Sequence, residues 1–391
     1  MRFSSFLFGL LVLFSLVFSQ PDSLNMKLVG MWEPGDTNEL ITSFAVQDSY
    51  LYILTGITSS PYQNIYSINI SDPSTPTVVS EITRNSDLGE YPFGVTANTD
   101  SFLYGVYYGG HDFSSYGLGI LGISQPWSLT VVYAGHIVGG LRDACPYSDS
   151  TGTYLACQCI VDSTGVGGIR ILDVTVPSSP ELLSWYYVPE PIHDGYHIIE
   201  HNVCGIDVKY PNLFSFETIE RYDTTGPFGG VYESGWIEVK KFDLRDLSSP
   251  PVVWRTDEET ISDVGIIFWG GVVGDGNIFV SADINDASNS IYFLSYTDDT
   301  LVEACESMAD IYPLNAVNDT YYTWDARQKV IAINFTDSCS IDTLGYYTFG
   351  ALGGHRLVVN GQYIFVDSSN AIYILSWLPD QIDGQGYLQQ K

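Results

Sequence analysis

The chain has few basic residues. It contains 15 lysines and arginines against 46 aspartates and glutamates, which gives a formal net charge of −31 at pH 7. Proteins bind nucleic acids and anionic lipids through clustered lysine and arginine side chains, and here Lys240 and Lys241 are the only adjacent pair. The composition therefore excludes a nucleic-acid partner and favours a cationic partner, a divalent cation or a neutral glycan.

Long hydrophobic runs are missing after the N-terminus. Residues 6–18 form an apolar run behind Arg2 that is shorter than the roughly 20 residues of a membrane-spanning helix. Val17-Phe18-Ser19 fits a leader peptidase site. We predict a signal peptide over residues 1–19, a secreted mature chain from Gln20 and no membrane span; an uncleaved anchor is the alternative. Residues 380–391 form a polar tail without a lipid-anchor signal.

Common enzyme motifs are also missing. The chain has no Gly-x-Ser-x-Gly, no His-Glu-x-x-His and no Gly-x-Gly-x-x-Gly that opens a helix. Carboxylates are abundant, so a pair of the glycosidase kind stays open. Four candidates stand near the starts of predicted strands, where a capping or solvated role is the alternative: Asp143, Asp194, Glu200 and Asp263.

Sustained helical periodicity is absent, whereas strand signals recur along the chain. A short alternating strand is followed by a polar turn, often with proline, and then by another strand. The recurring pattern has seven equivalent positions: Ile70, Ile123, Val174, Leu244, Tyr296, Phe335 and Trp377. Seven units of roughly 50 residues predict an all-β, seven-bladed β-propeller, a single domain over residues 20–379. Six blades are the alternative.

The last predicted unit lacks its fourth strand. Residues 355–360, 363–366 and 371–377 supply three strands, and the polar tail follows them. Lys27–Trp32 precedes the first unit and belongs to no unit of its own. We predict that this segment pairs with the last strand and closes the ring, which removes an open sheet edge.

One repeat carries a family resemblance. Gly168-Ile-Arg-Ile-Leu-Asp-Val-Thr-Val-Pro-Ser-Ser-Pro-Glu-Leu-Leu183 resembles the repeat of the LVIVD-repeat propellers, and Ile65–Ile82 and Val239–Trp254 resemble it less closely. Gly354–Asp367 resembles the inner strand pair of that family. Residues 264–350 depart from the pattern because they lack the pair of prolines. The resemblance implies a propeller that is exported or surface-attached, and it implies no catalytic residues.

Three of the six histidines lie within nine residues: His193, His197 and His201. On a strand, His197 and His201 would share a face about 13 Å apart, too far to bind one ion. We therefore predict no metal site and no cofactor. The histidines are candidates for ligand binding, and a hydrogen-bonded structural role is the alternative.

The fourth unit is longer than the others. Pro211–Trp236 adds glycines, acidic residues and several aromatic residues, including Phe228, Tyr232 and Trp236. Aromatic rings beside hydrogen-bonding groups suit the binding of a sugar or a peptide. We predict the ligand-binding surface here, next to the histidine segment. An extended hairpin that packs on its own blade is the alternative.

Two kinds of covalent modification fit an exported chain. Six cysteines are candidates for disulfides: Cys145, Cys157, Cys159, Cys204, Cys305 and Cys339. We predict that Cys145 pairs with Cys157 or Cys159, and Cys305 with Cys339. Three sequons make Asn69, Asn318 and Asn334 candidates for glycosylation.

These observations favour a secreted, monomeric propeller that binds a protein or a glycan outside the cell. A second hypothesis is a secreted hydrolase or lactonase-like enzyme that uses carboxylates at the mouth of the central channel, with Ca²⁺ as its cofactor. A structural component of a matrix or coat is a third. The sequence identifies no ligand and no catalytic residue.

Overall fold

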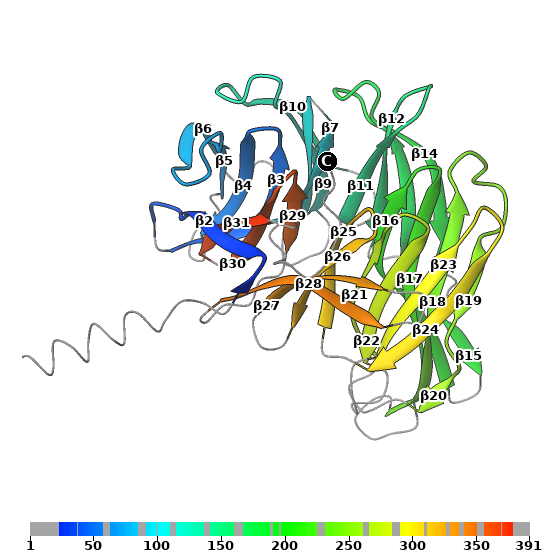
Figure 1. Ribbon diagram of the computed structural model, residues 1–391. Coiled ribbons are helices and arrows are strands. Elements are labelled where there is room, and N and C mark those ends of the chain that lie inside the picture. Colours follow the sequence, from blue (N-terminus) through cyan, green and yellow to red (C-terminus); the bar gives the residue numbers. More distant parts are fainter. Residues whose placement is uncertain are drawn as a thin grey trace, which may run out of the picture.

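The computed structural model consists of seven separate antiparallel sheets arranged in a ring (Figure 1). It describes residues 23–36, 38–57, 63–84, 91–99, 101–109, 115–136, 141–159, 167–187, 191–194, 197–224, 231–260, 266–283, 290–308, 311–325, 329–335, 340–349, 356–368 and 370–377. The predicted all-β fold and the count of seven blades are confirmed, and the six-blade alternative is wrong.

Blades one to three follow the chain in order. Blade one is β3 (Glu39–Gln47), β4 (Tyr50–Ile57), β5 (Gln63–Asn69) and β6 (Thr77–Arg84). Blade two is β7 (Tyr91–Thr99), β8 (Phe102–Gly109), β9 (Ser115–Gly122) and β10 (Thr130–His136). Blade three is β11 (Leu141–Ser148), β12 (Thr153–Cys159), β13 (Gly168–Asp173) and β14 (Glu181–Tyr187).

Blade four is the largest sheet. It contains β15 (Ile192–Asp194), β16 (His197–Lys209), β17 (Asn212–Asp223), β18 (Val231–Asp243), β19 (Val252–Arg255) and β20 (Glu259–Thr260). Blade five is β21 (Ile267–Val273), β22 (Asn277–Asp283), β23 (Ser290–Tyr296) and β24 (Leu301–Met308).

Blade six is β25 (Ile311–Val317), β26 (Thr320–Asp325), β27 (Lys329–Phe335) and β28 (Ile341–Thr348). Blade seven is β29 (Leu357–Asn360), β30 (Tyr363–Ser368) and β31 (Ala371–Trp377). One strand of each blade contacts the corresponding strands of its neighbours and so lines the axis of the ring. These innermost strands are β3, β7, β11, β16, β21, β25 and β29.

The predicted equivalent positions share one backbone hydrogen bond. All but one donate their N–H, at 2.7–2.9 Å, to a carbonyl in or directly beside the turn that joins the innermost strand of the blade to the next strand. Six positions make this bond: Ile70, Ile123, Val174, Leu244, Tyr296 and Trp377. The seventh, Phe335, ends β27. The sequence repeat therefore marks the place where the third strand of a blade ends.

The core is divided among the interfaces between blades. Among the described residues, seven clusters of buried apolar side chains each join two neighbouring blades. One of them joins Phe365 and Ile372 of blade seven to Ile53 and Ile68 of blade one. Burial of apolar surface between blades therefore continues around the whole ring.

The N-terminal segment closes the ring, as the sequence predicts. β2 (Met26–Trp32) pairs with β31 as the fourth strand of blade seven. The segment also reaches blade six, because β1 (Ser23–Leu24) pairs with β28 and the Asn25 side chain donates a 2.8 Å hydrogen bond to the Leu344 carbonyl. Within the described residues, no helix is long and apolar enough to span a membrane.

Candidate functional site

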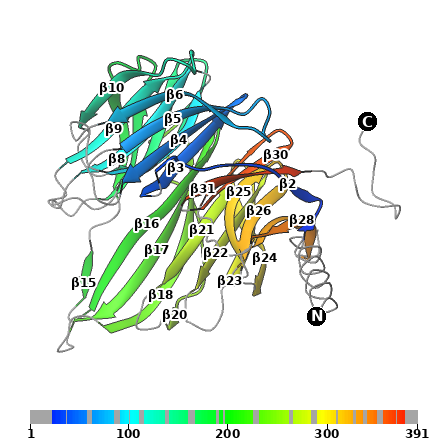
Figure 2. The ribbon, with the colours of Figure 1, turned by 90° about the vertical axis from the view of Figure 1, so that its left-hand side faces the viewer.

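Blade four departs most from the regular pattern. Its strands β16, β17 and β18 contain 13, 12 and 13 residues, whereas the four strands of blade one contain seven to nine. They pair along their full lengths and extend beyond the neighbouring blades to the end where β15 and β20 lie (Figure 2). We call the distal part of this sheet, residues 197–203, 217–223 and 231–238, the blade-four extension.

The extension corrects the prediction of an inserted loop. Residues 212–223 are strand, and the side chains of Phe214 and Phe216 are fully buried against blade five. Their hydrophobicity therefore serves the core, and the alternative of an extended hairpin is the one observed. Phe228 lies outside the described residues. Tyr232 and Trp236 are half-buried on β18.

The extension has two faces, because side chains alternate along a strand. One face looks toward blade three, since Lys240 of β18 contacts Tyr186 of β14. The other looks toward blade five, since Phe216 packs on Phe268 at a ring separation of 5.9 Å. His197 and His201 share the first face, as predicted. His193 is exposed and pairs with Ile198, which places it on the other face.

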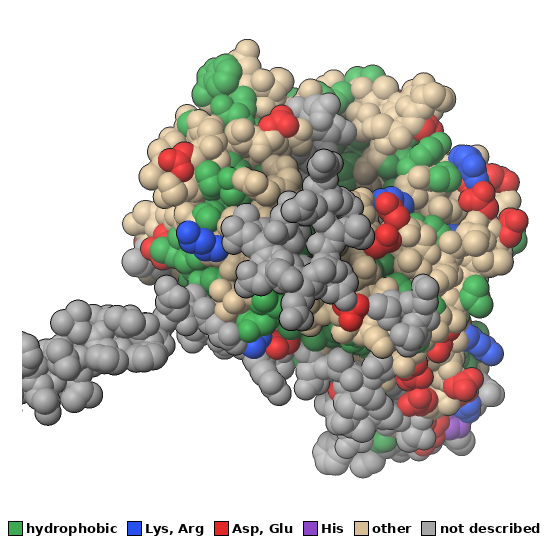
Figure 3. Space-filling model, in the orientation of Figure 1, with side chains coloured by type: hydrophobic (Ala, Val, Ile, Leu, Met, Phe, Trp, Pro, Cys, Tyr) green, Lys and Arg blue, Asp and Glu red, His purple; other side chains and the backbone are tan. Residues whose placement is uncertain are grey.

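On the blade-three face, the outer cluster is ionic. His197 Nδ1 lies 3.0 Å from the Glu233 carboxylate, and Arg221 Nε lies 3.6 Å from the same group. All three side chains are about one-third exposed. Figure 3 shows acidic, basic and histidine side chains together at the lower right of the molecule, over this end of blade four. Because these side chains are partly exposed, the Arg221–Glu233 ion pair contributes little to stability.

Deeper on the same face, a lysine is surrounded by acceptors. Lys240 donates to the Glu217 carboxylate and to the Tyr186 hydroxyl at 3.0 Å, and it lies 3.2 Å from Glu238. The Trp236 indole donates to Glu238 at 3.0 Å, which fixes its ring. Burial favours the neutral amine, but the Glu217 carboxylate raises the pKa of Lys240 and keeps it charged.

His201 lies beside this group without a partner for one nitrogen. Its Nδ1 atom is buried and has no hydrogen-bond partner among the described residues. Burial, together with the charge of Lys240, lowers the pKa of His201. The imidazole is therefore neutral at physiological pH, and it can donate to or accept from a polar ligand.

On the blade-five face, two carboxylates stand opposite each other. Glu200 of β16 pairs in register with Glu220 of β17. Tyr222 donates a short hydrogen bond to Glu200, and the Ile266 N–H donates to Glu220 at 2.6 Å. Burial, and secondarily the charge of Glu200, raises the pKa of Glu220. Glu200 was a candidate from sequence, whereas Glu220 was not.

Two tyrosines continue this face. Tyr222 pairs in register with Tyr232, and their rings meet edge to face at 5.8 Å. Burial raises the pKa of both phenols, and the two carboxylates raise it further. Two hydroxyls, two carboxylates and two aromatic rings therefore gather on one side of the sheet. We call Glu200, Glu220, Tyr222 and Tyr232 the blade-four cage.

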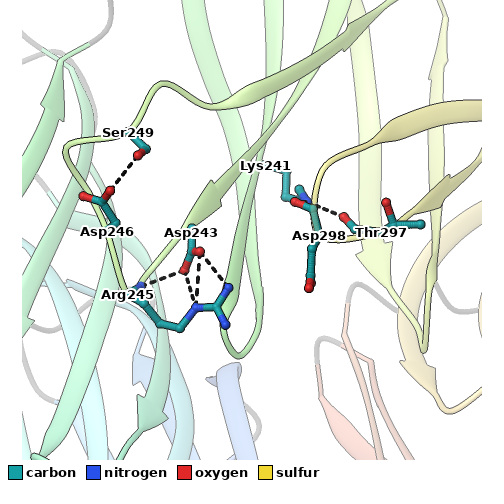
Figure 4. A network of polar contacts seen from close by, with 7 residues as sticks. All are labelled: Lys241, Asp243, Arg245, Asp246, Ser249, Thr297 and Asp298. Atoms are coloured by element: carbon teal, nitrogen blue, oxygen red, sulfur yellow. Dashed lines mark hydrogen bonds and ion pairs between the residues drawn. The ribbon is translucent and has the colours of Figure 1, made fainter.

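The opposite end of β18 is held by polar contacts to turns (Figure 4). The Lys241 ammonium donates to the backbone carbonyls of Thr297 and Asp298 in blade five. Arg245 bonds the Asp243 carboxylate through two nitrogens, at 2.9 and 2.7 Å. Lys241 thus ties this end of the hairpin to blade five, and the extension is the opposite end.

The predicted disulfides of Cys145 do not form. Cys145 pairs in register with Ala156, so Cys157 and Cys159 point to the opposite face of blade three. Cys157 and Cys159 pack against blade two, whereas Cys145 packs against blade four. The prediction that either of them bonds Cys145 is wrong, because adjacent register positions alternate between faces. Cys339 lies outside the described residues, so its bond to Cys305 stays a prediction.

The other sequence candidates are dispersed. Asp143 lies on β11 and Asp194 on β15, and Asp263 lies outside the described residues. Asn318 occupies an exposed turn with φ of 54°, whereas Asn69 and Asn334 end or line strands of blades one and six. The described residues contain no group of three or more histidine, cysteine or acidic side chains suited to a metal ion.

Comparison with known proteins shows the fold. No family model and no curated protein matches the chain, so its membership of the LVIVD-repeat propellers stays a prediction. An ulvan lyase from a new polysaccharide lyase family superimposes with a TM-score of 0.52 and 9% identity, over 90% of this chain and 95% of that one. A second polysaccharide lyase gives 0.50 and 8% identity, over 87% and 90%. A periplasmic gluconolactonase of Pseudomonas aeruginosa gives 0.45 and 11%, over 79% and 85%.

Proposed function

We propose that this propeller is a secreted glycan-binding module and that the blade-four cage is its binding site. The single observation behind the proposal is the cage itself, in which hydrogen-bonding groups lie beside two aromatic rings on a sheet that extends past its neighbours. Sugars are bound by such combinations, because ring faces cover their apolar C–H groups while carboxylates and hydroxyls accept their hydrogen bonds.

Three further points support a glycan as the ligand. The net charge of −31 disfavours anionic partners. Phe214 and Phe216 are fully buried in the core, whereas Tyr222 and Tyr232 are half-buried, and Tyr232 packs at the edge of that core. Both tyrosine rings therefore keep exposed surface for binding. Two proteins that share the fold are named as polysaccharide lyases, which is compatible with a propeller that binds a polysaccharide.

The test is the substitution Tyr232→Ala, with Trp127→Ala as the matched control. Trp127 is 63% exposed on blade two, far from the cage in sequence. On a glycan array followed by calorimetry, Tyr232→Ala should weaken binding by about 2 kcal/mol. The control should bind normally, and both variants should melt within a few degrees of the parent protein.

Two results would contradict the proposal. If Tyr232→Ala unfolds, the ring belongs to the core and carries no binding function. If it stays folded and binds every ligand found on the array normally, the site lies elsewhere, with the channel mouth as the next place to examine.

A second candidate function is a glycoside hydrolase, and one observation favours it. Burial raises the pKa of Glu220, whereas its neighbour Glu200 is half-buried. In glycosidases, such a difference in environment moves the pKa values of two carboxyl groups apart, so that one acts as an acid and the other as a base or nucleophile. Glu220 would protonate the departing oxygen, and Glu200 would assist attack at the sugar carbon. Release of reducing ends that Glu220→Gln abolishes would support this activity; binding without turnover would leave the protein a binding module.

A further inference from the structure

The two carboxylates of the blade-four cage repel each other. Directly opposed residues on antiparallel strands have Cβ atoms about 5 Å apart, and like charges at such positions are destabilising. Glu220 is only 8% exposed, so solvent screens this repulsion weakly. Gly235 of β18 pairs in register with Glu220 on one side and with Glu259 of β20 on the other. Glu259 therefore adds a third carboxylate to this face.

The described residues place no lysine or arginine beside this pair. Arg221 and Lys240 lie on the same hairpin, but both point to the opposite face and pair there with glutamates. Lys241 shares the face of the cage, yet it lies six positions along β18 from Gly235, about 20 Å away. The exposed His193 of β15 lies on this face, because it pairs in register with Ile198.

Glu220 also keeps an unused acceptor. Its Oε1 atom accepts the Ile266 N–H at 2.6 Å, and a carboxylate has room for further donors at its remaining lone pairs. A carboxylate that is more than nine-tenths buried costs free energy unless it is paired. The cage therefore has both the charge and a free lone pair for a cationic donor.

From this arrangement, which deepens the proposed glycan-binding function, we infer that the blade-four cage binds the ammonium group of an amino sugar. The ammonium donates to Glu200 and Glu220, and its charge cancels their repulsion. The rings of Tyr222 and Tyr232 attract the same cation and cover the sugar ring. The ligand class is therefore a glycan that carries free amino groups.

An ammonium group fits better than Ca²⁺. Calcium takes six to eight oxygen ligands, whereas the cage offers two carboxylates that face each other across one strand pair. Phenol rings add nothing to a calcium site, but they attract an ammonium ion through their faces. The aromatic half of the cage is thus explained by an organic cation.

The test compares a glucosamine oligomer with its N-acetylated counterpart, which has the same length but no charge. We expect the glucosamine oligomer to bind at least about tenfold more tightly at low ionic strength, and salt to reduce the difference. Glu200→Gln and Glu220→Gln should each remove about tenfold of affinity for the charged oligomer only. Glu81→Gln on blade one is exposed and serves as the matched control.

Each result has one meaning. Preference for the charged oligomer that both cage variants abolish and the control retains supports the inference. Equal binding of both oligomers without an effect of either variant overturns it and leaves glycan binding intact. Binding of neither oligomer, with capture of a lysine pentapeptide, overturns the glycan proposal as well. If Glu220→Gln misfolds in a thermal melt, the half-buried Glu200→Gln still decides the matter.

Discussion

Glu217 and Lys240 form an ion pair inside the interface between blades three and four, where their side chains are 0% and 8% exposed. The pair lies next to the fixed indole of Trp236 and under the Tyr186 hydroxyl. Tyr186 lies near the end of β14 in blade three, whereas β18 of blade four continues past Lys240 into the extension. The ion pair therefore lies at the boundary between the core of the propeller and the extension.

Removal of one partner of this pair should destabilise the fold strongly. Burial raises the pKa of Glu217 and Lys240 opposes this shift, so Lys240→Met leaves a buried carboxyl that must stay charged without a counter-ion or take up a proton. Removal of one partner of a buried ion pair typically costs about 3–5 kcal/mol. Lys209→Met is the control, because Lys209 and Asp275 are about half exposed and such pairs contribute about 1 kcal/mol or less. Urea denaturation measures both. Equal effects of the two variants would show that the buried pair has no special role.

Glu220 should make stability fall as pH rises. Its pKa is raised above the ordinary 4.5, so the folded protein holds a proton that the unfolded chain has released. This contribution is complete below pH 4.5 and is lost as pH rises through the folded pKa. Glu220→Gln should therefore gain on the order of 1 kcal/mol over the parent at neutral pH and little at pH 4, measured by denaturation at several pH values. A gain that does not depend on pH would contradict this assignment.

His201 should act in the opposite direction. Burial lowers the pKa of His201 below 6.5, so just below pH 6.5 the unfolded chain binds a proton at this residue and the folded protein does not. The stability of the parent is complete above pH 6.5 and declines as pH falls through the folded pKa. His201→Phe should lack this decline between neutral and mildly acidic pH. The exposed His193→Phe should retain it, and a decline in neither protein would place the titration elsewhere.

Gly30 should tolerate no side chain in the closing strand β2. A Cβ atom there would lie 1.7 Å from the Pro73 carbonyl oxygen in the turn of blade one. Gly30→Ala should therefore lower the melting temperature by several degrees, as overpacking costs about 1–3 kcal/mol. Gly35→Ala is the matched control, because an added Cβ meets nothing within 4 Å.

Deletion of residues 20–34 should have a larger effect than Gly30→Ala. It removes β1 and β2, so β31 becomes an open edge and β28 loses its pairing with β1. Exposed edges pair with other chains, and we expect aggregation in light scattering. A soluble deletion variant with one cooperative transition would show that ring closure does not need this segment.

The sequence alone determined the propeller, its seven blades and its closure by Lys27–Trp32. These features depend on local patterns, since alternation, turn residues and the end of each third strand repeat along the chain. The backbone hydrogen bond shared by Ile70, Val174 and Leu244 is the structural counterpart of that repeat. The last unit lacks its fourth strand and Lys27–Trp32 belongs to no unit, so the two could be matched from the sequence.

The tertiary structure alone decided which side chains meet. Phe216 and Tyr232 are both aromatic residues of one hairpin, yet Phe216 is fully buried in the core, whereas Tyr232 is half-buried at the edge of that core and meets Tyr222. Cys145 and Cys157 stand on neighbouring strands but face different blades. Glu200 meets Glu220 through strand register across 20 positions of sequence. Register and the packing of neighbouring blades are non-local, so residue type and spacing could not reveal these contacts.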